Sequence, residues 1–268
     1  MITKDFFLKN RPIIGMIHTL GLPGTPKNKA TVTQIIDQAL KELEIYKGAG
    51  IDAVMIENMH DIPYLKRVVG PEITATMTVI CQEVRRQYKG PLGLQILAGA
   101  NKDALAVSLA TGLDFIRAEG FVFAHVGDEG IIESDAGELL RYRKAIGAEH
   151  ILVFNDIKKK HSAHSITADV DIVETAHAAE FFLSDGVIVT GASTGKEASL
   201  DEVKAVKKHS PLPVMVGSGV NLENVERYLP HADGIVVGSY FKKDGQWDNE
   251  MDPERVKRFM DKVRTLRA

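Results

Sequence analysis

Cysteine is nearly absent from this chain, since its 268 residues contain one, Cys81. A single cysteine excludes an intrachain disulfide framework and leaves no cysteine cluster of zinc-site spacing. Cys81 shares a helical face with Ile73, Met77 and Ile80, which predicts a small core residue rather than a catalytic thiol. We therefore expect a reducing compartment and a cytoplasmic location.

Long apolar runs are also missing, because no stretch approaches the roughly 18 unbroken apolar residues that span a bilayer. The N-terminal stretch MITKDFFLKNRP lacks the apolar core of a signal peptide, and its Asp5 argues against a transit peptide. We expect mature, cytosolic sequence with no transmembrane segment, so any membrane association is peripheral.

The chain has no large excess of charge of either sign, and its formal net charge is -3 at pH 7. A field this weak gives no reason to expect nucleic acid as a partner. No Pro/Ser-rich linker, low-complexity tract or shift in composition divides the chain. We expect one domain over residues 1–268, whose 44% hydrophobic content can fill a sizeable core.

What the sequence does contain is eight short apolar runs that alternate with segments of helical period. Most runs are near-continuous in apolar residues, which is typical of parallel strands covered on both faces. A capping box formed by Thr31 and Gln34 opens the first helix, expected over 31–47. The predicted strands are 12–18, 51–58, 92–97, 113–119, 150–156, 185–191, 213–219 and 233–239. Eight such units most simply close into an α/β fold, the (β/α)8 TIM barrel, with a doubly wound open sheet as the alternative.

Small residues follow the last two predicted strands, in VMVGSGV and GIVVGSY. Glycines let an anion approach backbone N–H groups closely, and barrel phosphate sites often use the loops after strands seven and eight. The same glycines also suit ordinary tight turns. The candidate phosphate-binding residues are Gly217, Ser218, Gly219, Gly238 and Ser239, with Gly191 after the sixth strand.

The stretches VGSGVNLENV and HADGIVVGSYFKKDG resemble the end of the ribulose-phosphate-binding barrels, a group that includes the tryptophan synthase α subunit. PIIGMIHTLGLPGTP, GIDAVMIENMHDIPY, DIKKKHS and DGVIVTGASTG extend the resemblance to the BtpA/SgcQ family. This resemblance implies a phosphate-binding barrel. In cyanobacterial members it also implies a part in building photosystem I.

Ionisable residues end the first, second and fifth strands and are the candidate catalytic groups. His18 ends strand one, where it can act as an acid or base or serve as a hydrogen-bonded structural residue. Glu57 ends strand two, and a carboxylate beneath a pocket gains a raised pKa from desolvation. The resemblance supports this role for Glu57, although an ion pair with Arg117 is the structural alternative. Asp156 and Lys158 follow strand five and suit proton transfer or phosphate contact.

Two loops stand out by length and charge. Residues 119–136, after strand four, lack periodicity, and a loop this long is usually a functional lid. Residues 156–168, after strand five, form a basic loop in which we expect Lys159 and Lys160 to be solvated. The acidic residues and histidines of both loops have no spacing that requires a metal, and no metal or particular cofactor is predicted. The candidate substrate-positioning residues are Asn58, Gln95, Arg117, Asn155 and Thr190.

Two functions remain open from the sequence. The first is an enzyme that binds a phosphorylated small molecule, such as a sugar phosphate or a nucleotide-like compound. It would use acid/base chemistry of an isomerase, epimerase, lyase or phospho-ligand hydrolase type. The second is a non-catalytic assembly or stability factor for a membrane protein complex, which works through protein contacts. A homo-oligomer is possible in either case.

Overall fold

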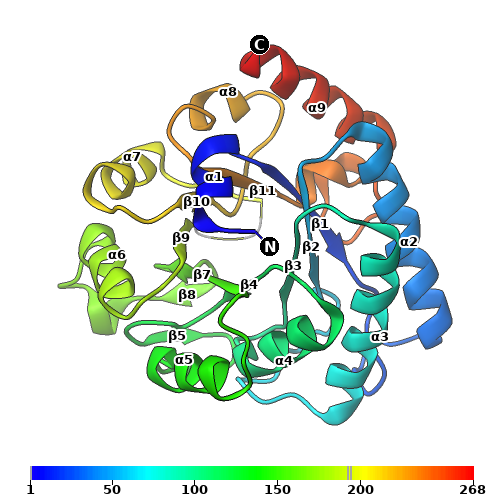
Figure 1. The fold of residues 1–268 in the computed structure, drawn as a ribbon, viewed down its shortest axis with the longest axis horizontal. Coiled ribbons are helices and arrows are strands. Elements are labelled where there is room, and N and C mark those ends of the chain that lie inside the picture. Colours follow the sequence, from blue (N-terminus) through cyan, green and yellow to red (C-terminus); the bar gives the residue numbers. More distant parts are fainter. Residues whose placement is uncertain (1, 192, 194) are drawn as a thin grey trace.

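The computed structural model describes residues 2–191, 193 and 195–268, and its strands form a closed barrel (Figure 1). All eight barrel strands are parallel and lie within the ranges predicted from the sequence, apart from one residue at the end of β7. They are β1 (Ile13–His18), β2 (Ala53–Glu57), β3 (Leu92–Gln95), β4 (Phe115–Ala118), β7 (Leu152–Ile157), β9 (Gly186–Val189), β10 (Val214–Val216) and β11 (Gly234–Val237). Pairing of Ile13 with Ile235 closes the sheet, which confirms the (β/α)8 barrel and excludes the open sheet.

Helices surround the barrel, as the periodic segments predict. They are α2 (Val32–Ala49), α3 (Pro71–Gln87), α4 (Asn101–Thr111), α5 (Ala136–Ala145), α6 (Ile172–Phe181), α7 (Leu200–His209), α8 (Val225–Tyr228) and α9 (Pro253–Arg267). The capping box that opens α2 is confirmed, because the amide of Gln34 donates to Thr31 Oγ1 and the amide of Thr31 donates to Gln34 Oε1. Cys81 is buried on α3, and burial raises the pKa of its thiol well above the ordinary value.

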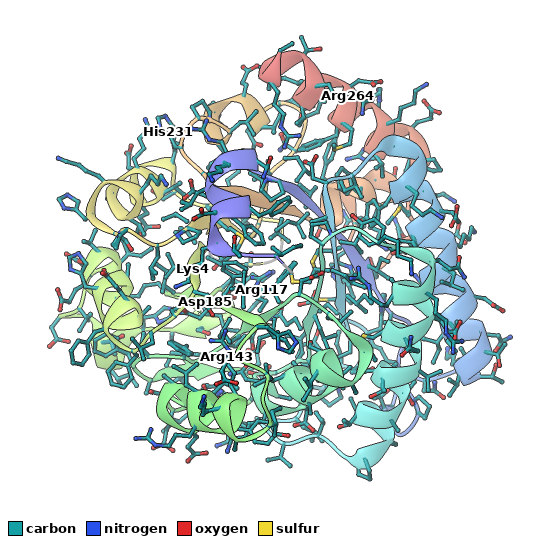
Figure 2. All side chains as sticks on the ribbon, in the orientation of Figure 1. Lys4, Arg117, Arg143, Asp185, His231 and Arg264 are labelled. Carbon is teal, nitrogen blue, oxygen red and sulfur yellow. The ribbon has the colours of Figure 1, made fainter. Side chains whose placement is uncertain are left out.

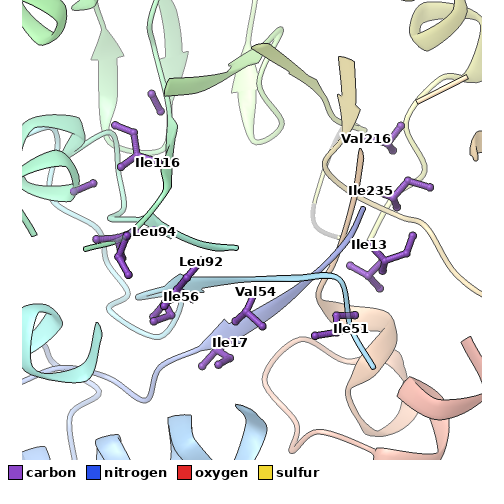
Figure 3. Packing of buried hydrophobic residues seen from close by; sticks show 14 of the residues in the cluster. Ile13, Ile17, Ile51, Val54, Ile56, Leu92, Leu94, Ile116, Val216 and Ile235 are labelled. Atoms are coloured by element: carbon purple, nitrogen blue, oxygen red, sulfur yellow. The ribbon is translucent and has the colours of Figure 1, made fainter. Parts of the chain in front are cut away.

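Alternation along the strands separates two apolar cores. Side chains such as Ile13 and Ile17 point outward and pack against the helices (Figure 3). Their neighbours Ile14 and Met16 point inward and join a second core at the amino-terminal end of the barrel. The barrel interior is therefore filled with apolar side chains at this end.

A short helix that the sequence did not predict, α1 (Lys4–Asn10), covers this end of the barrel (Figure 1). It buries Phe7, whose ring contacts those of Phe115 and Phe154 with centroids 5.8 and 4.6 Å away. Lys4 and Arg143 both form ion pairs with Asp185, at 3.1 and 3.0 Å, beside α1 (Figure 2). These contacts leave the carboxyl ends of the strands as the face available for a site.

The two loops singled out from the sequence pair with each other. The segment 119–136 contains β5 (His125–Gly127) and β6 (Gly130–Ile132), and the basic loop contains β8 (Ser162–Ala163). β5 lies between β6 and β8 in a small antiparallel sheet. Strands of two or three residues carry no readable periodicity, which explains why the sequence indicated only loops.

Within the described part of the chain, no helix is both long enough and apolar enough to cross a membrane.

Candidate active site

A cavity of ≈ 390 Å³ opens at the carboxyl ends of β1, β2, β4, β10 and β11. This is the face at which TIM-barrel sites lie. The wall includes five of the six predicted phosphate-binding residues, which are Gly217, Ser218, Gly219, Gly238 and Ser239. His18, Glu57 and Arg117 also line it, so three of the other predicted residues reach the same space.

Alternation along the strands fills the amino-terminal end of the barrel with apolar side chains. Two residues further along the same strands, the inward-pointing side chains are polar. Above Met16 and Met55 of the inner core lie His18 and Glu57, which face each other across adjacent strands. His18 Nε2 lies 3.4 Å from Glu57 Oε2, and both residues are buried. The register between β1 and β2 therefore places His18 next to Glu57.

The pKa of Glu57 is shifted in the direction opposite to the one predicted from the sequence. Burial alone raises the pKa of Glu57, but the hydrogen bond from His18 and the positive charges of His18, Lys160 and Arg117 lower it to about 2. The predicted raised pKa is therefore wrong, and Glu57 is an ionised carboxylate at neutral pH. The direct ion pair of Arg117 is also not with Glu57.

Arg117 instead holds Asp156 in a bidentate ion pair. Arg117 Nε and Nη2 donate to the two carboxylate oxygens of Asp156 at 2.8 and 2.9 Å. Burial lowers the pKa of Arg117, but the charge and hydrogen bonds of Asp156 outweigh this and raise it well above the ordinary value. Arg117 lines the cavity and Asp156 lies behind it, so the geometry makes Asp156 a positioning residue rather than a group in contact with a ligand.

The lysine of the basic loop that reaches the cavity is Lys160, not Lys158. Lys158 has a left-handed backbone (φ 47°), which ends the alternation of β7, and its Nζ donates to the carbonyl of Thr167 at 2.9 Å. Lys160 lines the cavity, and burial and the charge of Arg117 lower its pKa. The expectation that Lys159 and Lys160 are solvated is wrong, since Lys159 is buried and Lys160 faces the site.

Glu119 is a buried carboxylate that the sequence analysis did not single out. It accepts a hydrogen bond from Gln95 Nε2 at 3.1 Å and lies 3.5 Å from Lys159 Nζ. Burial raises its pKa to about 7, although Lys159 and Arg117 act in the opposite direction. The raised pKa expected at Glu57 thus occurs at Glu119, whose depth in the fold no sequence pattern reveals.

The turns after β9 and β10 are held together by Ser218. Its hydroxyl accepts a hydrogen bond from the amide of Gly191 at 2.7 Å and donates to the carbonyl of Lys196 at 3.0 Å. Gly219 has φ +72°, and a Cβ there would lie 2.3 Å from the backbone of Lys196. Gly191 does not line the cavity and supports this turn from behind.

Four predicted positioning residues lie outside the cavity and form internal hydrogen bonds. Asn58 Oδ1 accepts from the amide of Leu97 at 2.7 Å, and Asn155 Oδ1 accepts from the hydroxyl of Ser184. Thr190 Oγ1 accepts from the amide of Lys160, and Gln95 contacts Glu119. These side chains position the loops around the site and do not face the cavity.

Two arginines of α9 line the cavity mouth and were missed in the sequence. Arg255 stacks over the ring of Tyr240, 4.3 Å from its centroid, and its Nε donates to the Tyr240 carbonyl. Arg258 lies one helical turn further and is exposed. The sequence signal for these arginines is their i, i+3 spacing on the helix after the last strand, which places both on one helical face. Among the described lining residues, four basic side chains face two carboxylates, so the cavity favours an anion.

Metal ligands are not grouped in the described residues, where no cluster of three or more histidine, cysteine, aspartate or glutamate side chains could hold an ion.

A closed parallel barrel with a basic cavity at the carboxyl ends of its strands defines a TIM-barrel protein with a site at that face. The model of the BtpA family matches residues 9–265. The chain therefore belongs to the BtpA family. It is 49% identical over 273 residues to an uncharacterized protein of Caenorhabditis elegans whose name describes it as mitochondrial, covering 100% of this chain and 98% of that one.

A second relative is the photosystem I biogenesis protein BtpA of Synechocystis, which is 30% identical over 261 residues. The match covers 95% of this chain and 88% of the Synechocystis protein. Solved structures share the fold at low identity. The geranylgeranylglyceryl phosphate synthase of Thermoplasma acidophilum, in complex with sn-glycerol-1-phosphate, has a TM-score of 0.63 at 16% identity, covering 99% and 100% of the two chains. The thiamine phosphate pyrophosphorylase of Pyrococcus furiosus has a TM-score of 0.60 at 14% identity, covering 98% and 99%.

Proposed function

We propose that this protein is an enzyme that binds a phosphorylated small molecule in the basic cavity and acts on it by proton transfer. One observation carries the proposal. The glycine and serine ends of β10 and β11 share one cavity of ≈ 390 Å³ with the His18–Glu57 pair and with Lys160. Anion-binding backbone and ionisable side chains thus face the same ligand-sized space.

The phosphate group belongs at the β10 and β11 ends in this proposal. In this proposal the phosphate contacts the backbone of Gly217, Gly219 and Gly238, which line the cavity, and Arg255 and Arg258 supply positive charge at the mouth. Both structural neighbours above are enzymes named for phosphate compounds, and one of them is in complex with sn-glycerol-1-phosphate, which agrees with a phosphorylated ligand here.

The proton-transfer groups of the proposal are Lys160 and His18. The lowered pKa of Lys160 increases the fraction of neutral amine that can take a proton from a substrate. Ionised Glu57 lies 3.4 Å from His18 Nε2 and orients the ring of His18. Lys160 thereby takes the role that the sequence analysis assigned to Lys158. The reaction proposed for these groups is that of an isomerase, epimerase or lyase.

The phosphate site is tested with inorganic phosphate and a charge reversal at the cavity mouth. Arg258→Glu should weaken phosphate binding about fivefold at low ionic strength, since exposed charge contacts contribute up to about 1 kcal/mol. Lys257→Glu is the matched control, because Lys257 is exposed on the same helix, makes the same charge change and does not line the cavity. Isothermal titration calorimetry measures both. Equal phosphate affinities for the two variants would refute the phosphate site.

Gly217→Asp is a poorer test, although it adds a negative charge at the predicted phosphate site. A Cβ at this position would lie 2.5 Å from Ile188 Cγ2, so the variant perturbs packing as well as ligand binding.

Protein contact is the second candidate function, and an exposed apolar segment favours it. Phe181 and Leu183 are 81% and 71% exposed at the end of α6, beside a groove that includes Leu140 of α5. Sedimentation velocity tests whether this segment holds two copies together. A monomer at all concentrations would refute the prediction of a homo-oligomer. A dimer that dissociates in the Phe181→Ser variant would support contact through this segment. A cytoplasmic location stays a prediction.

A further inference from the structure

A second cavity, of ≈ 300 Å³, lies beside the first and shares His18 as part of its wall. Its other walls come from α2, from the segment that connects β11 to α9, and from Leu20 and His60 in the loops after β1 and β2. Lys41, Asp248, Asn249 and Glu250 are exposed at its rim. Its floor contains a buried ion pair between Glu42 and Lys242, which joins α2 to the chain after β11. The cavity is therefore open to solvent and has a charged floor.

Three polar atoms of the lining residues have no hydrogen-bond partner among the described residues. They are His18 Nδ1, Gln38 Oε1 and Glu42 Oε2. His18 and Glu42 are 4% and 5% exposed, and buried polar atoms are rarely left unpaired. Gln38 Nε2 already donates to the His18 carbonyl at 3.3 Å, which leaves its oxygen free for another group.

Two of these atoms, Gln38 Oε1 and Glu42 Oε2, are hydrogen-bond acceptors. Lys242 Nζ pairs with Glu42 Oε1, which leaves Oε2 of the same carboxylate to accept from another group. A ligand group that pairs with these two oxygens must supply hydrogen-bond donors.

We propose that the second cavity is a subsite that binds a hydrogen-bond-donating group, either a primary ammonium or neighbouring hydroxyls. Because His18 lines both cavities, we assign the phosphate of one ligand to the β10 and β11 ends and its donor group to the space beside Gln38. This assignment rests on the proposed phosphate site for the position of the ligand. The second cavity then determines which phosphorylated compound is bound.

Trp247, the one tryptophan of the chain, reports on this cavity. Its ring lies 5.1 Å from that of His60, which lines the wall. Glucosamine 6-phosphate and glucose 6-phosphate are the probes, because they differ in an ammonium or a hydroxyl at one carbon. Inorganic phosphate reports on the first cavity alone. We expect both sugar phosphates to bind more tightly than inorganic phosphate and to change Trp247 fluorescence, and the tighter one identifies the donor.

The decisive variant is Gln38→Leu, which removes one acceptor. It should lower the affinity for the tighter sugar phosphate about fivefold and leave that for inorganic phosphate unchanged. Gln82→Leu, the same substitution on α3 away from both cavities, is the control. Gln38→Glu retains an acceptor and should restore binding of glucosamine 6-phosphate, which a merely structural role for Gln38 would not explain.

Equal sugar-phosphate affinities for Gln38→Leu and the unaltered protein would overturn the subsite. If inorganic phosphate itself does not bind, the phosphate site fails, and the subsite is then judged with glycerol and ethanolamine. In that arm, an unchanged Trp247 signal at millimolar concentrations of both compounds also overturns it, whereas a Gln38-dependent change supports it.

Discussion

The ion pair between Arg117 and Asp156 yields the most direct test of how the site is built. Both side chains are buried, and two hydrogen bonds of 2.8 and 2.9 Å join them. Removing one partner leaves an uncompensated buried charge, so Arg117→Met and Asp156→Leu should each lower the free energy of unfolding by about 3–5 kcal/mol. Arg117→Met should cost more, because Arg117 also stabilises the charges of Glu57 and Glu119.

The double variant separates pairing from packing. Replacing both partners by apolar side chains removes the unpaired charge, so the double variant should cost less than the two single variants together by about 2 kcal/mol or more. Urea denaturation followed by far-ultraviolet circular dichroism measures all four proteins at one pH. Additive effects in this cycle would show that Arg117 and Asp156 contribute independently, and the positioning role of Asp156 would be refuted.

Three further changes test the electrostatics, the packing and the closed end of the barrel. The pKa of Glu119 is raised from 4.5 to about 7, so the native state keeps a proton that the unfolded state releases. Stability should therefore fall by up to about 3 kcal/mol between pH 4.5 and 7, and urea titrations of Glu119→Gln should show a smaller fall. Gly93→Ala should lower the free energy of unfolding by about 1–3 kcal/mol, because its Cβ would lie 2.1 Å from Phe115. The control Gly48→Ala, within α2, should raise it by about 0.5–1 kcal/mol in the same denaturation assay. Phe7→Ala should cost about 3–5 kcal/mol, and a loss below 1 kcal/mol would show that α1 is not part of the barrel core.

The barrel could be predicted from the sequence because its strands are near-continuous apolar runs. Residues such as Ile13 and Ile14 are apolar on both faces, since one face packs on helices and the other on the inner core. The three short strands could not be predicted in this way. Their pairing, as between Val126 and Ala163, depends on contacts between distant parts of the chain.

The site was predictable only as far as strand alternation continues. His18, Glu57 and Arg117 were found because each lies at a strand end and points inward. The alternation stops at Lys158, which has a positive φ. As a result Lys160 faces the cavity in place of Lys158. The pKa of Glu119 depends on burial, which the sequence does not show.

The small sheet of β5, β6 and β8 has a consequence for how this barrel can change. Residues 158–161 are held at one end by β7 and at the other by β8, which pairs with β5. The three lysines of this short segment have different surroundings. Lys158 donates to Thr167, Lys159 lies beside Glu119, and Lys160 lines the cavity. Lys158 and Lys159 thus hold the segment to its neighbours. Substitutions at Lys160 can therefore alter ligand preference while the contacts of Lys158 and Lys159 keep the segment in place.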